Sequence, residues 1–371
     1  RLGNMNYLVT NNGYNMFDMM SMMQKAIRRG IFEYAGFAAN ELQDKFRSAM
    51  WNRILVISSE DCYGVITKEL VELRKRDERE KDSKLISAAI ALLCKSLKSR
   101  DGCYFACNFI LASRNPRKIK VKEDEVSSLY KRLNANEKPV EFDLFGFAQG
   151  NDDYLDAEIS EKFSRGVELQ KAIKHIDMDM IGYTIDLLRR TDRAFLWNVM
   201  LDYAKEQASV IYEEIYSLKI ADDYVNARKP NLQKDEIFIS KAAILLCYCE
   251  DEEFFELASS DIVCLAKKID WNNIRIKDVK TCVLENGEIP IWVFDCHTIK
   301  GKKMGKTDWD MTTDEQAALF PLRTAYFDEA SWIYTYEQDF DNGDISEKGI
   351  QPIREYAKTH PANPVEFIPY E

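Results

Sequence analysis

The sequence holds little glycine and proline and very little histidine. Its 371 residues include 15 Gly, 9 Pro and 3 His. Because glycine and proline break helices, their scarcity indicates a mainly helical protein with few tight turns. The histidines, His175, His297 and His360, form no HxH or HExxH pattern and no legible Ser-His-Asp set. These absences weaken the hydrolase and metalloenzyme interpretations.

Long apolar runs are also missing. No segment reaches the roughly 18 to 20 apolar residues that a membrane-spanning helix needs, and the first residues show no signal-peptide pattern. With 46% hydrophobic and 30% charged residues, the composition is that of a globular protein with a sizeable core. The length suggests two or three domains. We therefore expect a cytoplasmic protein that makes no contact with a membrane.

Cysteine occurs nine times, without a CxxC pair. Several cysteines, such as Cys94 and Cys247, lie in apolar runs, which is typical of reduced core thiols in a cytosolic protein. Cys103 and Cys107 are four residues apart and could place two zinc ligands on a helix. We nevertheless predict no metal site and no bound cofactor.

The net charge is −11. An acidic protein is not an obvious nucleic-acid binder, because phosphate contacts need clustered Lys and Arg. Two segments are locally basic all the same: residues 113–122, SRNPRKIKVK, and residues 297–306, HTIKGKKMGK. They supply the main candidate contacts to phosphate, which are Arg114, Arg117, Lys118, Lys120, His297, Lys300, Lys302, Lys303 and Lys306.

One stretch of the sequence is repeated. Residues 24–61 align with residues 170–207 at a constant offset of 146, with eleven of 38 positions identical. The matches include the block Gln-Lys-Ala-Ile at 24–27, and Trp51-Asn52 with Trp197-Asn198. Since chance would give roughly two matches, we interpret the alignment as a diverged internal duplication.

Apolar residues at helical spacing predict the helices of both copies. In the first copy we expect a Met-rich helix from residue 15 to Gly30, then helices at Phe32–Leu42, Phe46–Ile57 and Leu85–Leu97. The last has a counterpart at Ile239–Cys247, where the offset is 153. We expect the methionines to lie in the core rather than in an adaptable binding groove.

The chain therefore divides into four parts. Residues 1–132 form a first helical module, 133–165 a linker, 166–270 a second, diverged module, and 271–371 the remainder. In the remainder, two β-rich runs flank Asn286-Gly287 and predict a β-hairpin. The basic segment 297–306 follows, and then a helical tail.

The first module resembles a known family. Gln24–Arg29, Arg53–Asp61 and Lys98–Arg100 are similar to phrases in the C-terminal helical region of the replication-associated recombination ATPases, the family of bacterial RarA. The resemblance covers about residues 15–112 and reaches the second copy only through the repeat. It implies the collar fold of clamp loaders, oligomerisation, and a bacterial or phage-infected cytosol or nucleoid.

The resemblance does not imply ATP hydrolysis. The family's ATPase domain would precede this region, and the sequence has no Walker A and Walker B pair. Gly301 to Thr307 approaches a phosphate-binding loop, but its first glycine is one residue too close for GxxxxGK[ST]. The next residues, DWDMTTDE, offer capping residues rather than an immediate apolar helix.

Two further groups of polar residues have competing interpretations. Ser59-Glu60-Asp61 could form an acid–base or metal site, but we favour a helix end or the cap of the next helix. Arg28 and Arg29, equivalent to Lys174 and His175 in the second copy, could continue a basic track or stabilise helix C-termini.

The sequence favours a non-enzymatic accessory protein of DNA replication, recombination or repair. It would act through partners, and through DNA at the two basic segments. One alternative is a structural or assembly protein that forms a homo-oligomer. The other is a nucleotide- or phosphate-handling enzyme that uses the 295–307 loop.

Overall fold

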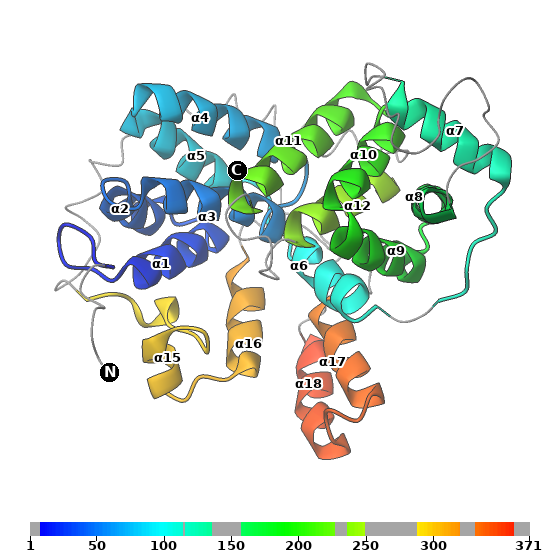
Figure 1. The fold of residues 1–371 in the computed structure, drawn as a ribbon. Helices are drawn as coiled ribbons and strands as arrows, with labels where there is room; N and C mark the ends of the chain where they lie inside the picture. Colours follow the sequence, from blue (N-terminus) through cyan, green and yellow to red (C-terminus); the bar gives the residue numbers. More distant parts are fainter. Residues whose placement is uncertain are drawn as a thin grey trace, which may run out of the picture.

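The computed structural model describes residues 8–113, 116–135, 157–226, 236–248, 288–319 and 331–359. Over these ranges the regular structure is helical, and β pairing is limited to two isolated bridges. The predicted mainly α fold class is confirmed (Figure 1).

Five helices form the first module, at the left of Figure 1. They are α1 (Met16–Arg28), α2 (Phe32–Leu42), α3 (Arg47–Glu60), α4 (Thr67–Glu80) and α5 (Ser83–Lys95). The four helices predicted here are present, and α2 has the predicted bounds. Met19, Met22 and Met23 of α1 are fully buried, so the prediction of a methionine core stripe is confirmed.

Five more helices form the second module, at the right of Figure 1. They are α8 (Ala157–Lys174), α9 (Met178–Thr191), α10 (Arg193–Ala204), α11 (Ser209–Asn226) and α12 (Glu236–Tyr248). Along the chain, the two sets of five helices are separated by α6 (Asp101–Phe105), the π-helical turn η1 (Ala106–Leu111) and α7 (Glu123–Asn134).

The C-terminal segment lies below both modules in Figure 1. It comprises the 3-10 turn η4 (Ile291–Val293), α15 (Ile299–Lys303), α16 (Asp308–Ala318), α17 (Trp332–Asp341) and α18 (Glu347–Thr359). Helices α17 and α18 pack around Trp332, which also contacts Trp309 of α16. Asn108 of η1 holds this pair of helices, because its side chain binds the Ser331 carbonyl and the Thr335 hydroxyl.

Equivalent positions of the two modules make the same polar contacts. In each module a buried carboxylate accepts hydrogen bonds from a tryptophan indole and an arginine of the preceding helix. The indole distances are 2.7 Å in the first module and 2.6 Å in the second. The groups are Trp51, Arg47 and Asp77 in the first module and Trp197, Arg193 and Asp222 in the second.

The turn between the first two helices of each module is also alike. Gly30 and Ile176, which are 146 residues apart, both have left-handed backbones with φ of 64° and 52°. The residue that follows, Ile31 or Asp177, donates its N–H to a backbone carbonyl in the last turn of the preceding helix, at 2.9 Å in both modules. These shared contacts support the predicted repeat, whose origin by duplication stays a prediction.

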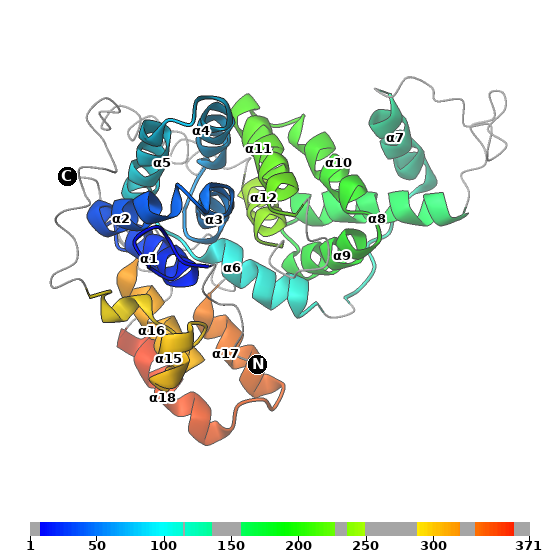
Figure 2. The same ribbon diagram turned by 60° about the vertical axis from the view of Figure 1, so that its left-hand side comes forward.

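The modules join along α4 and α11, which run in the same direction (Figure 2). Residues that are 146 positions apart meet across this contact: the Lys68 N–H donates to Glu214 at 2.9 Å, and the Tyr224 hydroxyl donates to Glu78 at 3.2 Å. Glu214 also accepts the Thr67 N–H at 2.7 Å. A side chain of the second module therefore caps the start of α4.

The fifth helices of the modules are placed differently. Helix α5 packs within its own module, whereas α12 packs both against α11 of its own module and against α3 and α6. Lys241 of α12 donates to the Cys62 carbonyl at 2.7 Å. On α9, the turn η1 packs so closely that a Cβ on Gly182 would lie 2.1 Å from the Phe109 carbonyl oxygen. The modules therefore share one interior rather than forming two independent domains.

Three details differ from the sequence-based division. Helix α7 packs against α8 and α10, so it belongs with the second module although it lies largely before residue 133. Residues 157–165 of the predicted linker are the start of α8. The second run of the predicted hairpin contains a 3-10 turn, Ile291–Val293, and the first run lies outside the described residues.

None of the helices in the described ranges combines the length and apolar character that crossing a bilayer requires.

Replacing Ile176 with glycine is expected to raise the free energy of unfolding by about 0.5–1 kcal/mol. The left-handed strain of a residue with a Cβ, about 1–2 kcal/mol, outweighs the extra entropy that glycine loses on folding. Chemical denaturation measures the change. Lys174→Gly, at the last residue of α8, is the control and should lower stability; an equal loss in both variants would contradict the prediction.

Candidate nucleic-acid interface

The basic segment 297–306 forms the short helix α15 and its flanking turns. Thr298 caps the start of the helix, because its hydroxyl oxygen accepts the Gly301 N–H at 3.0 Å. Gly305 ends the helix with a φ of 75°. Thr307 then begins α16 through a capping box with Asp310. Local hydrogen bonds therefore fix both ends of α15.

Buried polar contacts attach this segment to α1. Lys25 donates to the Val293 carbonyl at 3.0 Å and forms a 2.7 Å ion pair with Asp295. Ser21 donates to the same carbonyl at 2.7 Å. Burial opposes ionisation of Asp295, but Lys25 outweighs it and lowers the pKa of that carboxyl. A Cβ on Gly301 would lie 1.9 Å from the Asp295 carbonyl oxygen, so α15 sits directly on this anchored turn.

The cationic side chains of the segment lie at the surface. Lys302 and Lys303 are exposed and Lys306 is half-buried. Lys300 is exposed and lies 4.3 Å over the ring of Phe294. His297 is exposed in the turn that precedes the helix. The structure therefore brings all five predicted contacts of this segment onto one short, anchored element.

The backbone of this segment is not arranged as a phosphate-binding loop. Helical and turn hydrogen bonds already use the N–H groups of Lys302, Met304 and Lys306, and the Thr307 N–H donates to Asp310. A phosphate-binding loop needs such groups to surround the phosphates. Helix α16 follows directly, although the sequence shows capping residues there instead of an apolar helical pattern.

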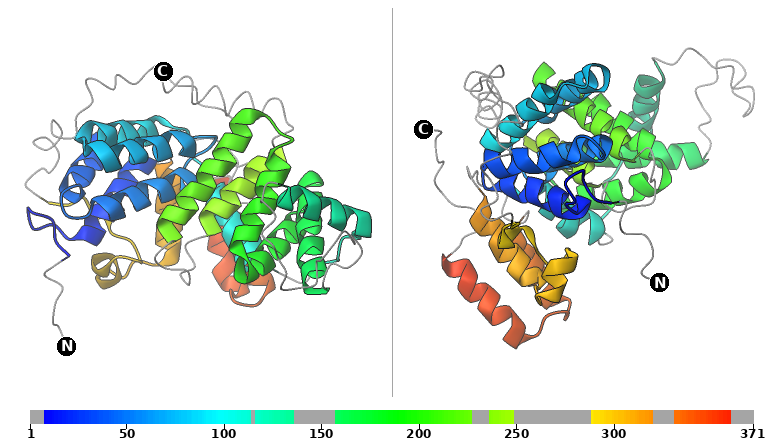
Figure 3. Two further views of the ribbon diagram at one scale, coloured as in Figure 1. Left: turned by 45° about the horizontal axis from the view of Figure 1, so that its top comes forward. Right: turned by 90° about the vertical axis from the view of Figure 1, so that its left-hand side faces the viewer.

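The second basic segment lies far from the first. Arg117, Lys118 and Lys120 are exposed in the stretch that leads to α7, and Arg114 is outside the described residues. Figure 1 and the left view of Figure 3 place α15 and α7 at opposite ends of the molecule. The two segments therefore do not form one continuous track.

Arg28 and Arg29 do not extend the basic surface. Arg28 is buried, with 3% of its surface exposed. Arg29 is half-buried, forms two 2.9 Å hydrogen bonds with Asp314, and lies 4.7 Å over the Trp292 ring. Both guanidinium groups are thus engaged within the protein, which corrects their assignment as nucleic-acid contacts.

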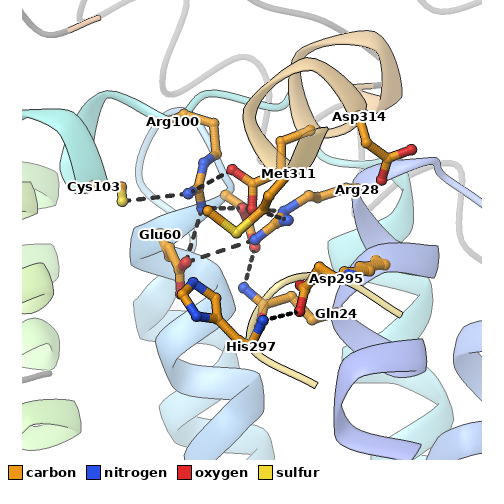
Figure 4. Close-up of polar contacts among 12 residues, drawn as sticks. Gln24, Arg28, Glu60, Arg100, Cys103, Asp295, His297, Met311 and Asp314 are labelled. Atoms are coloured by element: carbon orange, nitrogen blue, oxygen red, sulfur yellow. Dashed lines mark hydrogen bonds and ion pairs between the residues drawn. The ribbon is translucent and has the colours of Figure 1, made fainter. Parts of the chain in front are cut away.

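Arg28 belongs to a buried charge cluster where α1, α3 and α16 meet (Figure 4). It contacts Asp61 at 2.7 Å and Glu315 at 2.6 Å. Arg100, the second cation, contacts the same two carboxylates at 2.9 Å and 3.0 Å, and Glu60 at 2.8 Å. Two guanidinium groups and three carboxylates therefore compensate one another away from water.

The charges shift the pKa of their neighbours. Burial alone would raise the pKa of Glu60, but Arg100 and Arg28 outweigh it and lower that pKa to about 2. The pKa of Arg28 is raised, because Asp61 and Glu315 overcome the effect of its burial. Glu60 and Arg28 therefore stay ionised at neutral pH. The ion pairs with Glu315 hold α16 against the first module.

Ser59-Glu60-Asp61 is thus a structural feature. Helix α3 ends at Glu60, as the helix-end interpretation predicts. The Asp61 carboxylate contacts side chains of α1 and of Arg100, the residue before α6, not the free N–H groups of the next helix.

Sequence reasoning missed this cluster, although the repeat contained a signal for it. The second copy has Lys174, Glu206 and Gln207 at the positions equivalent to Arg28, Glu60 and Asp61. Of these three positions only Asp61 loses its charge in the second copy, where Gln207 stands. A carboxylate that only the first copy has points to a contact specific to that copy, which here is the charge cluster that receives α16.

The zinc candidate Cys103 and Cys107 remains a pair of thiols. Cys103 accepts a hydrogen bond from Arg100 at 3.3 Å. Within the ranges that the structure describes, no third ligand-type side chain joins these two cysteines.

No protein-family model, curated protein or solved structure matches this chain. The resemblance to the RarA family therefore stays a prediction.

In the folded protein Glu60 is expected to titrate near pH 2, far below its ordinary pKa of 4.5. Its depressed pKa stabilises the fold above pH 4.5, and this contribution is lost as the pH falls through 2. Carboxyl carbon-13 shifts, assigned with Glu60→Gln, measure the midpoint.

Arg100→Gln should raise that midpoint, whereas Arg76→Gln, which removes an exposed partner of Glu80 on α4, should leave it unchanged. A midpoint near 4.5 in the unmodified protein would rule out the compensated cluster.

Proposed function

We propose that this protein is a non-enzymatic accessory factor of DNA replication, recombination or repair, active in the cytosol or nucleoid. The observation that carries the proposal is the cationic surface of α15, which is anchored to the first module through Asp295 and Lys25. The resemblance to the collar region of the RarA family supports the same setting. The missing phosphate-loop geometry disfavours the alternative of nucleotide chemistry.

The charge distribution explains how a protein with a net charge of −11 binds DNA. Phosphate contacts from Lys and Arg release counterions and dominate non-specific affinity. An acidic remainder repels the duplex, so only the basic elements approach it. The α15 surface would hold the backbone without reading sequence, because its lysines are suited to phosphate contacts. The exposed cations of 116–122 would contact a second, distant part of the DNA.

Reversing the charge of Lys300, Lys302, Lys303 and Lys306 to glutamate is expected to weaken duplex binding at low salt by at least about tenfold. The slope of log affinity against log salt concentration should fall in magnitude by about 3 to 4, since each phosphate contact contributes about 0.9. Fluorescence anisotropy of a labelled duplex, titrated at several salt concentrations, measures both quantities.

The matched control reverses four exposed lysines elsewhere, Lys84, Lys205, Lys348 and Lys358. It changes the net charge equally, so a specific role for α15 requires a much smaller effect. No binding of the unmodified protein at low salt would overturn the proposal.

A second candidate function is assembly into a homo-oligomer. Four of the seven exposed large hydrophobic side chains of the described residues belong to adjoining elements of one region. They are Phe17 of α1, Ile291 of η4, and Ile299 and Met304 of α15 with its end. Exposed apolar side chains on neighbouring elements are a feature of protein contact sites, and a second copy of the chain is the partner proposed here.

Light scattering should then give a mass that is a multiple of the chain mass. The variant Ile291→Ser/Ile299→Ser should dissociate the oligomer, whereas Tyr216→Ser, which removes an exposed apolar side chain of α11, should not. A monomer at every concentration measured would eliminate this function.

A further inference from the structure

Three different ligand-type side chains meet where α15 and α16 join. The Cys296 thiol, the His297 imidazole and the Asp308 carboxylate have ligand atoms that all lie within 4.8 Å of one another. Cys296 and His297 precede α15, and Asp308 follows it as the first residue of α16. They are the one group of three or more such residues in the described ranges.

Hydrogen bonds that do not use the three side chains hold them in position. The N–H groups of His297 and Thr298 donate to the Asp295 carboxylate at 2.9 Å and 3.2 Å. The capping box of Thr307 and Asp310 fixes the start of α16, and with it Asp308. The backbone on both sides is therefore set before any ligand arrives, and this lowers the entropy that binding would cost.

The charges and neighbours of the thiol suit a cation. Cys296 donates to Asp308 at 3.0 Å and lies in the field of the Asp295 carboxylate as well. Its sulfur is also 3.7 Å from the sulfur of Met311. A proton now joins the thiol to the carboxylate. A metal ion in its place would bind both groups, and the displaced proton would pass to solvent.

We propose that Cys296, His297 and Asp308 bind a divalent transition-metal ion of the zinc type. Sulfur, imidazole nitrogen and carboxylate oxygen are the three ligand kinds that zinc accepts, and zinc sites with three protein ligands keep a fourth position for water. The Met311 sulfur lies beside the thiol ligand. The ion would connect the two ends of α15 and so stabilise the helix. This inference does not depend on DNA binding.

The first test is a titration of the full chain with Co²⁺ as a spectroscopic probe, under reducing conditions and without DNA. One equivalent should give a thiolate-to-cobalt charge-transfer band, and one equivalent of Zn²⁺ should remove it by displacement. Cys296→Ser should abolish the band, and Asp308→Asn should weaken Co²⁺ binding at least tenfold. Cys107→Ser, which removes an exposed thiol of η1, should leave both unchanged.

A second measurement guards against variants that fold poorly. Zn²⁺ should raise the Tm of the unmodified protein and slow amide exchange of α15, with no such effect in Cys296→Ser. No stoichiometric binding by the unmodified protein would overturn the proposal. A band that persists in Cys296→Ser, or disappears in Cys107→Ser, would do the same.

Discussion

The arrangement of the C-terminal segment depends on two buried guanidinium groups, those of Arg28 and Arg100. A buried charge without a partner costs several kcal/mol, so each must keep its carboxylates. Asp61 and Glu60 come from the end of α3, but Glu315 comes from α16, 287 residues beyond Arg28. Helix α16 is therefore required to complete the cluster. Because α15 is joined to α16 by a capped turn, its cations are positioned by the same requirement.

The two modules share an internal plan and differ in what they carry. Both hold a tryptophan and an arginine on a buried aspartate, and both turn through a left-handed residue after the first helix. The first module adds the charge cluster and so receives the C-terminal segment. In the second module, the fifth helix, α12, also packs against α3 of the first module. The turn η1 and helix α7 pack on other helices of the second module.

Helices and their buried faces could be predicted because apolar periodicity is a local property. The charge cluster could not, because Arg28 and Asp61 meet only in the fold. The hairpin prediction went wrong at Ile291–Val293, where β-branched residues follow Pro290. There the Val293 carbonyl binds Ser21 and Lys25 instead of a neighbouring strand, and its side chain enters the core. The group of Cys296, His297 and Asp308 was missed because its members stand at both ends of a helix, outside the short spacings of known metal motifs.

The cap of α4 has a consequence for synthesis on the ribosome. Helix α4 has no side-chain cap of its own. The carboxylate that binds its first N–H groups belongs to Glu214, which is 147 residues beyond Thr67. At about 5–20 residues per second, the nascent first module waits roughly 7 to 30 s for this partner. During that interval the start of α4 stays open to water or to a chaperone, and the first half completes its fold only when the second half has emerged.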